Sequence, residues 1–344
     1  MLLHSIASKL NKKSLQIAAL ALLACLLFVV VYLFRVLNSP LQVSAETTYF
    51  EVEPGSSLTR VARELDAENL IKHPRIFSLY GQYSGAANSI QSGEYEITAG
   101  ISARDFLDMM VAGNTVQYRL TLVEGWTLQQ SLTAIWGSPN ITREIEPTNA
   151  AGIAAVLGLP TESAEGLLFP DTYFYTKGSS DIEILRRANS RLENVLEEAW
   201  DNRLGALPYD NSYDALIMAS IIEKETAAGS DRGDISGVFV RRLEQGMRLQ
   251  SDPTVIYGMG ENHDGDIRRE DLLEETAYNT YRINGLPPTP IALAGIESIL
   301  ASLNPLPSNY LYFVSKGDGT HYFSSTLEEH NAAVNRFQLN QQSQ

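Results

Sequence analysis

The feature that most constrains the fold is an uninterrupted apolar run from Leu15 to Phe34. Gln16 is the only strongly polar side chain in this run. A helix of about 20 apolar residues is long enough to cross the hydrocarbon core of a bilayer, which is about 30 Å thick. The run therefore predicts a single transmembrane helix over residues 15–34.

Charge is distributed unevenly around this run. Residues 1–35 contain four basic side chains and no acidic one, and only Arg35 follows the run closely. The whole chain has 26 basic and 41 acidic residues, so the remainder carries 26 − 4 = 22 basic against 41 acidic side chains. Basic residues stay preferentially in the cytoplasm. We therefore expect a cytoplasmic tail over residues 1–14 and an exported chain over residues 36–344. A net charge of −15 also argues against a nucleic-acid partner.

Two other kinds of N-terminal segment also contain an apolar run. A cleaved signal peptide has a shorter apolar core, of about 7–15 residues, that ends at small residues. Residues 29–34 offer no such site. A lipoprotein signal is conceivable at Cys25, but nine more apolar residues follow it, which favours a residue within the helix. Cys25 is the only cysteine, so we expect neither a disulfide framework nor a cysteine-rich metal site.

After a short tether, placed at residues 35–45, one unit recurs three times. It consists of an alternating strand, a glycine turn, a Ser or Thr cap and an amphipathic helix, and it begins near Tyr49, Gly93 and Tyr118. Alternation with period two is typical of half-buried strands. A hydroxyl after the glycine accepts the first free N–H groups of a helix. The pattern predicts a mixed α+β region over about residues 46–135.

The first of these units resembles a LysM module, a small βααβ glycan-binding fold. The matching residues are Val52, Pro54, Gly55, Ser57, Leu58, Val61, Ala62 and Leu65. Ser56, which follows Gly55, stands where that family usually has Asp. We therefore predict a LysM-like membrane-proximal module over residues 46–117. The alternative is a βα spacer that holds a catalytic domain away from the membrane.

The rest of the chain is richer in helical patterns, and it predicts a mixed α+β domain over residues 118–340. An Asp cap, a proline-opened helix, a hairpin signal and a capping box mark its elements. The expected elements are helices opening at Asp181, Asp234 and Thr289-Pro290, a hairpin from Tyr310 to Phe323, and a last helix capped by Thr326 and Glu329.

One carboxylate stands out in this domain. From Ala215 to Ile222 only Ser220 is polar, so the segment predicts a buried helix. Glu223 follows directly, on the same stripe as buried residues. Burial raises the pKa of a carboxyl, as a general acid requires near neutral pH. Glu225 lies about 200° away around the helix and would not share a site with Glu223 unless the helix ended between them. The alternative is that Glu223 is a helix-end acid that leaves the core for solvent.

Further polar residues occupy loops stiffened by Gly and Pro, and we expect several to line the cleft of Glu223. Amides, hydroxyls and tyrosine rings suit sugar recognition, since sugar faces stack on aromatic rings and sugar hydroxyls need paired donors and acceptors. Turns and core tyrosines are the alternative interpretation. The candidate substrate-binding residues are Ser220, Glu225, Gln250, Ser251, Asp252, Thr254, Tyr257, Tyr278, Asn279 and Thr280.

Six motifs together resemble the YceG-like family, the endolytic murein transglycosylases. They are EGWT (124–127), GLLFPDTY (166–173), ASIIEKET (219–226), LQSDPTVIYG (249–258), YNTY (278–281) and GLPPTPI (285–291). The resemblance covers about residues 45–335. It implies an α+β enzyme of the bacterial inner membrane that cuts glycan strands of peptidoglycan with its catalytic domain in the periplasm. It also implies Glu223 as the catalytic glutamate, no metal or other cofactor, and peptidoglycan synthases as candidate partners.

The implied reaction needs one carboxyl group. Protonated Glu223 would protonate the glycosidic oxygen between N-acetylmuramic acid and N-acetylglucosamine. The carboxylate would then take the proton of the muramoyl C6 hydroxyl, which closes a 1,6-anhydro ring and ends a nascent strand. No second carboxylate is needed, in contrast to ordinary glycosidases. Two alternatives stay open: a hydrolase that pairs Glu223 with Asp252 or Glu225, and a non-catalytic glycan-binding scaffold for cell-wall synthases.

Overall fold

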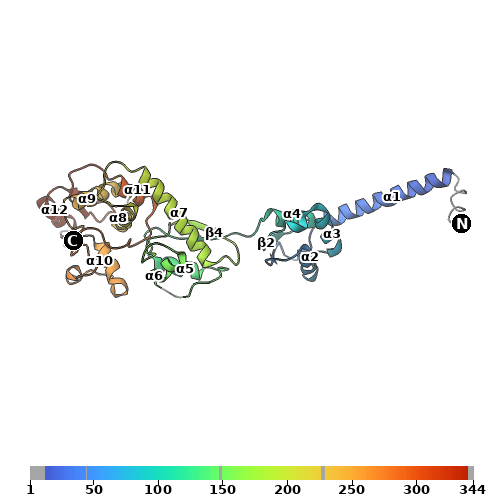
Figure 1. The fold of residues 1–344 in the computed structure, drawn as a ribbon, viewed down its shortest axis with the longest axis horizontal. Coiled ribbons are helices and arrows are strands. Elements are labelled where there is room, and N and C mark those ends of the chain that lie inside the picture. Colours follow the sequence, from blue (N-terminus) through green and yellow to red (C-terminus); the bar gives the residue numbers. More distant parts are fainter. Residues whose placement is uncertain (1–11, 44, 147–148, 226–228, 340–344) are drawn as a thin grey trace. The chain divides into compact units, whose positions relative to one another are not determined.

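The computed structural model describes residues 12–43, 45–146, 149–225 and 229–339. The chain divides into two compact units, Met1–Tyr118 and Arg119–Gln344, and Figure 1 shows their elements. The described strands form three two-stranded sheets, and the remaining elements are mostly helices. The predicted mixed α+β character is therefore confirmed. The expected bounds of a LysM-like module over residues 46–117 and a catalytic domain over residues 118–340 stay predictions.

The N-terminal helix α1 spans Lys12–Leu37. Within the described residues it is the one helix long and apolar enough to cross a membrane, over Ser14–Leu37. Its large apolar side chains from Leu15 to Phe34 are exposed, as a lipid-facing surface requires. The helix therefore fits the predicted membrane span, while its orientation in a membrane stays a prediction.

The first unit continues with a two-stranded sheet and four short helices. Its elements are β1 (Thr47–Val52), α2 (Leu58–Ala67), α3 (Pro74–Ser84), η1 (Ala86–Asn88), β2 (Gly93–Thr98) and α4 (Ala103–Ala112). Strands β1 and β2 are antiparallel, with Phe50 opposite Tyr95, and both rings pack edge-on against Phe106. Ser57 and Ser102 cap α2 and α4 through their hydroxyls, as the sequence predicted. The order β1-α2-α3-β2 is βααβ; that the module is of the LysM class stays a prediction.

The segment expected to be a tether is packed against this unit. Helix α1 continues to Leu37, and Leu37 and Leu41 are both buried. The backbone N–H of Leu41 donates to the carbonyl of Ile101 at 2.8 Å. Apolar side chains within the expected tether explain the difference, because their burial against the module is favourable.

The second unit contains the remaining elements, and β3 pairs with β4. The third strand–helix unit of the sequence therefore belongs with the later part of the chain. The elements are β3 (Tyr118–Thr121), α5 (Leu128–Gly137), α6 (Ala150–Leu157), β4 (Thr172–Tyr175), α7 (Asp181–Asp201), α8 (Ser212–Glu225), η2 (Gly229–Asp231), α9 (Arg232–Glu244), α10 (Asp252–Met259), η3 (Gly260–Asn262), η4 (Asp271–Leu273), α11 (Ile296–Leu303), β5 (Tyr312–Ser315), β6 (His321–Ser324), α12 (Leu327–Val334) and η5 (Asn335–Leu339).

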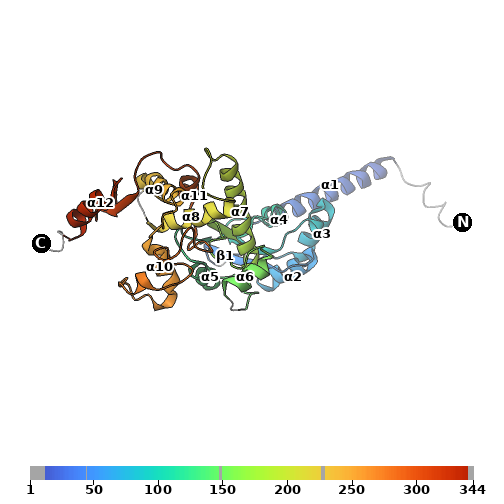
Figure 2. The same cartoon turned by 60° about the vertical axis from the view of Figure 1, so that its left-hand side comes forward.

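Helix α8 forms the centre of the second unit. Helices α7, α9 and α11 contact it, and α10 also contacts it (Figures 1 and 2). Every residue from Ala215 to Ile222 is buried, so the predicted buried helix is confirmed. Its end, at Glu225, is thereby held in a fixed place in the fold.

The prediction that a helix starts at Thr289-Pro290 is wrong. Helix α11 begins only at Ile296, and residues 291–294 are buried in a non-helical conformation. The N–H of Leu293 donates to the carbonyl of Trp126 at 2.7 Å, and the N–H of Gly125 donates back to Leu293 at 2.8 Å. This strand-like exchange satisfies buried backbone N–H and C=O groups through a segment that is distant in the sequence. Local helix propensity does not predict such hydrogen bonds.

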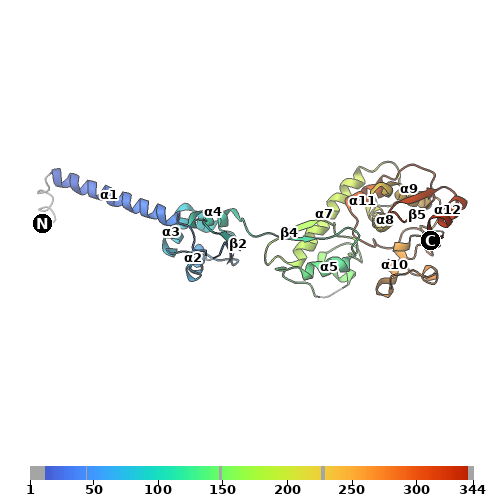
Figure 3. The ribbon, with the colours of Figure 1, turned by 180° about the vertical axis from the view of Figure 1, so that it is seen from behind.

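At the C-terminal end the predicted hairpin and capping box are confirmed. Strands β5 and β6 pair antiparallel, with Phe313 opposite Phe323. The Thr326 hydroxyl and the Glu329 carboxylate exchange hydrogen bonds with each other's backbone N–H at the start of α12. Figure 3 shows β5 between α9 and α12, which both contact it. This hairpin supplies one wall of the cavity described below.

Gly166, in the GLLFPDTY motif, allows one stability prediction. Its φ is +71°, and an added Cβ would lie 2.3 Å from Cβ of Pro290. Gly166→Ala is expected to lower the free energy of unfolding by about 2 kcal/mol or more, from backbone strain plus the clash. Gly178→Ala is the matched control, because Gly178 has φ +86° but nothing within 4 Å of the added Cβ.

Urea unfolding followed by tryptophan fluorescence measures both variants. All three tryptophans of the chain lie beyond residue 119, so the signal reports the second unit. The Gly166 variant should unfold at clearly lower urea than the Gly178 variant. Equal midpoints would show that the contact with Pro290 costs nothing.

Candidate active site

Two carboxylates lie at the end of α8, on different faces. Glu223 and Glu225 are two residues apart, which places them about 200° apart around the helix. Each therefore meets a different set of neighbours, and those neighbours decide which chemistry each supports.

Glu223 is nearly buried and contacts an arginine and a backbone N–H group. Its side chain is 6% exposed, and its Oε1 lies 3.5 Å from Nη2 of Arg232, which is 12% exposed. Its Oε2 accepts a hydrogen bond from the N–H of Gly295 at 3.0 Å. Burial raises the pKa of nearby Glu124, and the charge of Glu223 raises it further. Glu223 therefore has a cation and a backbone donor as partners, and it does not line the cavity described next.

Glu225 lies on the wall of a polar cavity of about 660 Å³. Burial raises the pKa of Glu225 to about 7, against a hydrogen bond from Ser251 that lowers it; the charge of Asp252 raises it further. The Ser251 hydroxyl donates to Oε1 of Glu225. A carboxyl group with a pKa near 7 is protonated in a large fraction of molecules at neutral pH, as a general acid must be.

The cavity draws its walls from the loop before α10, from the β5–β6 hairpin and from α12. Its wall combines two carboxylates, three amides, a guanidinium, two imidazoles and aromatic rings. The lining residues are Glu225, Arg242, Leu249, Gln250, Asp252, Tyr281, Tyr312, Phe313, Val314, Ser315, Gly319, His321, Leu327, His330, Asn331, Val334 and Gln338.

Both loops that the sequence singled out meet at this cavity. The N–H of Ser251 donates to Oγ1 of Thr280 at 2.9 Å. The hydroxyl of Tyr281 donates to Oδ1 of Asp252 at 2.6 Å. Gln250 has φ +56°, a left-handed conformation that its neighbours must hold. The loops were expected in the cleft of Glu223; the structure brings them to Glu225.

Several predicted substrate contacts are buried parts of the scaffold. Thr254 and Thr280 share a hydrogen bond at 2.8 Å, and both are fully buried. The amide of Asn279 donates to the carbonyl of Glu274 at 2.7 Å and to further carbonyls of the preceding loop. Ser220 accepts the N–H of Ile291 at 3.0 Å. These side chains shape the loops and have their own partners.

Two predicted tyrosines lie outside the cavity lining. The rings of Tyr257 and Tyr278 are 4.8 Å apart. Tyr257 donates to Oε2 of Glu165 at 3.1 Å, and the hydroxyl of Tyr278 shares a hydrogen bond with that of Thr289 at 2.8 Å. Tyr257 thus connects α10 to Glu165, which directly precedes the GLLFPDTY motif, and Tyr278 contacts the GLPPTPI motif. The alternative interpretation as core tyrosines fits these contacts better.

Sequence reasoning missed the side chains that come from the C-terminal hairpin and α9. Arg242 donates to the carbonyls of Leu249 and Leu311, each at 2.7 Å, and its guanidinium lies 5.1 Å from the ring centre of Tyr312. The ring of His330 stacks on Tyr312 at 5.2 Å. The aromatic residues of the predicted hairpin were the available signal, because alternation places every second one on the same face.

The described residues contain no group of three or more His, Cys, Asp or Glu side chains placed to hold a metal ion. What the described geometry offers is a carboxyl group with a raised pKa, a hydroxyl that donates a hydrogen bond to it, and a cavity with polar and aromatic walls. Such a site can transfer a proton to a bound sugar oxygen.

The arrangement defines an α+β protein with an acid-bearing cavity in its second unit. A sequence model of the YceG-like family matches residues 50–336. The chain belongs to the YceG-like family.

Similar proteins support this assignment. The endolytic murein transglycosylase of Bacillus subtilis (strain 168) is 31% identical over 324 residues, which cover 88% of each chain. The endolytic murein transglycosylase of Streptococcus pneumoniae serotype 2 (strain D39) is 30% identical over 343 residues, 87% of this chain and 60% of that protein. A crystal structure of a putative YceG-like protein from Listeria monocytogenes is 32% identical, with a TM-score of 0.51, and covers 84% of this chain and 100% of that chain.

Proposed function

We propose that this protein is a lytic transglycosylase that cleaves the glycan strands of peptidoglycan. The names of its relatives in Bacillus and Streptococcus support this activity. The single observation that carries the chemistry is Glu225, a glutamate with a pKa of about 7 on the wall of a polar cavity.

Glu225 takes the role that the sequence argument gave to Glu223. The prediction for Glu223 rests on its place at the end of a buried apolar helix and on the resemblance of its motif to the YceG-like family. In the structure that burial comes with Arg232 and the Gly295 N–H as partners. Glu225 instead has a hydroxyl partner, a raised pKa and direct access to the cavity.

The proposed reaction uses one carboxyl group twice. Protonated Glu225 gives its proton to the glycosidic oxygen between N-acetylmuramic acid and N-acetylglucosamine, and the bond from C1 to that oxygen breaks. The muramoyl C6 hydroxyl attacks C1, and its proton returns to the Glu225 carboxylate. A 1,6-anhydro ring forms and no water is consumed. The hydrogen bond from Ser251 holds one carboxyl oxygen, which leaves the other free for the proton.

Gln250, Asp252 and Tyr281 are the predicted loop residues, or their direct neighbours, that reach the same cavity. We assign them to sugar hydroxyls, with the Tyr312 and His330 rings opposite as a stacking surface. A water-using hydrolase with Asp252 as its base and a non-catalytic scaffold are the alternatives. The names of the relatives favour neither.

The location of the enzyme is part of the proposal. We place α1 in the bacterial inner membrane with residues 1–14 in the cytoplasm and the catalytic domain in the periplasm, because of the charge step around the apolar run. There the enzyme would meet nascent strands and end their polymerisation, beside peptidoglycan synthases. A LysM-like module over residues 46–117 would hold the glycan near the membrane. A C-terminal reporter active only in the cytoplasm would contradict this orientation.

Purified full-length protein tests the activity on isolated peptidoglycan. The wild-type chain should release soluble glycan fragments in proportion to time and enzyme. A chain that binds the peptidoglycan but releases no fragment would support the scaffold alternative.

The pH dependence of the reaction follows from the pKa of Glu225. Because the free enzyme must carry a protonated Glu225, kcat/KM should fall about tenfold per pH unit above pH 7. The decrease of kcat/KM at high pH should follow the ionisation of a single group, because Glu225 serves as the acid and then as the base. Rates measured from pH 5 to 9 check this. A rate that stays constant up to pH 9 would show that Glu225 is not the acid.

A further inference from the structure

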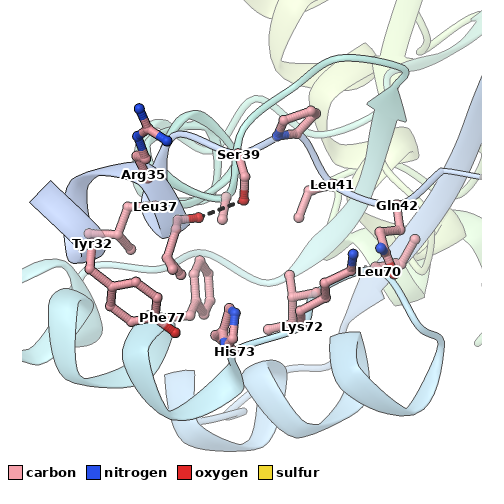
Figure 4. A pocket seen from close by; sticks show the side chains of 14 residues that line it. Tyr32, Arg35, Leu37, Ser39, Leu41, Gln42, Leu70, Lys72, His73 and Phe77 are labelled. Atoms are coloured by element: carbon pink, nitrogen blue, oxygen red, sulfur yellow. Dashed lines mark hydrogen bonds between the residues drawn. The ribbon is translucent and has the colours of Figure 1, made fainter.

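A second cavity lies in the first unit, where the predicted membrane helix meets the module. It has a volume of about 610 Å³ and lies between the end of α1, the segment that follows it and the start of α3 (Figure 4). Its residues are Tyr32, Arg35, Val36, Leu37, Ser39, Pro40, Leu41, Gln42, Leu70, Ile71, Lys72, His73, Phe77 and Ala103.

The cavity is positively charged. Arg35 lies on the α1 side, and Lys72 and His73 lie on the opposite side (Figure 4). The lining contains no carboxylate. Neither Arg35 nor Lys72 forms an ion pair with a residue in the described part of the chain. This is unusual in an exported chain with 22 basic and 41 acidic residues, and it marks the cavity as a place for a negatively charged group.

The rest of the lining is apolar. Leu37, Leu41, Leu70 and Phe77 are buried side chains whose edges form the cavity wall. A soluble anion would gain nothing from these side chains, whereas an acyl chain would. A ligand that fits both parts of the lining has a charged head and an apolar tail.

The position of the cavity relative to the predicted span points to the same ligand. The apolar run ends at Phe34, so Tyr32 and Arg35 fall where hydrocarbon gives way to headgroups. The ring of Tyr32 packs edge-on against His73 of the module, with ring centres 6.1 Å apart. The cavity is therefore continuous with the surface of the predicted membrane helix.

We propose that this cavity binds the phosphate headgroup of a bilayer lipid, with Arg35 and Lys72 on the phosphate and the apolar wall on the first part of an acyl chain. Two cations on one phosphate form charge-assisted hydrogen bonds. A bound lipid would fix the module at the end of α1 and set the distance of the second unit's attachment point from the bilayer. The proposal rests on the membrane anchoring proposed above and is independent of glycan cleavage.

Native mass spectrometry of the full chain in detergent tests the proposal. The probes are phosphatidylglycerol and, as the phosphate-free comparison, diacylglycerol with the same acyl chains. The wild-type chain should retain phosphatidylglycerol, and Arg35→Gln/Lys72→Gln should weaken this binding about tenfold. Diacylglycerol should bind more weakly and equally to both. Inorganic phosphate at the lipid concentration should not displace the lipid.

Matched variants separate charge from folding. Arg63→Gln/Arg104→Gln removes two exposed cations of the same module outside the cavity and should leave lipid binding unchanged. Arg35→Lys/Lys72→Arg keeps both charges and should also retain the lipid. Retention of phosphatidylglycerol by the Gln double variant at the wild-type level would overturn the proposal, as would equal binding of diacylglycerol or displacement by inorganic phosphate.

The outcome is distinguishable from a failure of the proposed function. The Gln double variant should cleave detached glycan strands at the wild-type rate, because the cavity lies in the first unit and Glu225 in the second. The Gln double variant should therefore lose lipid binding and keep glycan cleavage. Glu225→Gln should lose glycan cleavage and keep lipid binding.

Discussion

Glu225→Gln is expected to lower the rate of glycan cleavage by about 10²–10⁴-fold, the usual cost of losing a general acid. The amide has nearly the volume of the carboxyl and can still accept the hydrogen bond of Ser251, so the fold should persist. The rate of fragment release from isolated peptidoglycan measures the effect. The urea midpoint of the same preparation shows that the loss is chemical.

Glu223→Gln is the matched control on the same helix. It keeps an oxygen for the Gly295 N–H but loses the ion pair with Arg232. We expect the free energy of unfolding to fall by about 2 kcal/mol and the rate to fall less than tenfold. A folded Glu223 variant without activity, beside an active Glu225 variant, would restore Glu223 as the acid.

Asp181→Ala is expected to have the largest effect on stability. Asp181 is completely buried at the start of α7. Its carboxylate accepts the N–H groups of Glu144, Ile145 and Ile182 and the indole N–H of Trp136, at 2.9–3.3 Å. Removing it leaves these donors without a partner, at about 1–3 kcal/mol for each group that water cannot reach. We expect a total loss of about 3–5 kcal/mol in the free energy of unfolding.

Asp201→Ala is the comparison, because Asp201 is exposed at the other end of the same helix. It should change the free energy of unfolding by less than about 0.5 kcal/mol. Tryptophan fluorescence in urea reports both variants. A similar midpoint for the two would mean that the hydrogen bonds of Asp181 carry no net stability.

The sequence predicted those elements whose signal is local. Three such signals depend only on neighbouring residues, and each element appears as expected. They are the apolar run of α8, the capping box at Thr326 and the hairpin around Gly317. The start of α11 was wrong because residues 291–294 pair with Trp126, far away in the sequence. Asp181 was expected to cap α7, but Ser180 caps it and Asp181 instead joins α7 to the segment around residue 145.

The candidate site could be predicted only in part for the same reason. Sequence motifs selected the end of α8 and the loops at Gln250 and Thr280, which the structure does bring together. Which of the two glutamates faces the loops depends on the side of α8 that α10 covers, and this is a matter of tertiary packing. Tyr312 lies in the β5–β6 hairpin and His330 in α12, and neither residue falls within one of the six sequence motifs.

If Glu225 cleaves glycan strands without water, the mass of the new chain ends shows it most directly. Peptidoglycan is digested by the full-length protein in water labelled with heavy oxygen, and the masses of the fragments are measured by mass spectrometry. We predict muramoyl ends that are lighter by one water than reducing ends and free of label, with none released by Glu225→Gln. Reducing ends that carry one labelled oxygen would contradict the account and identify a hydrolase.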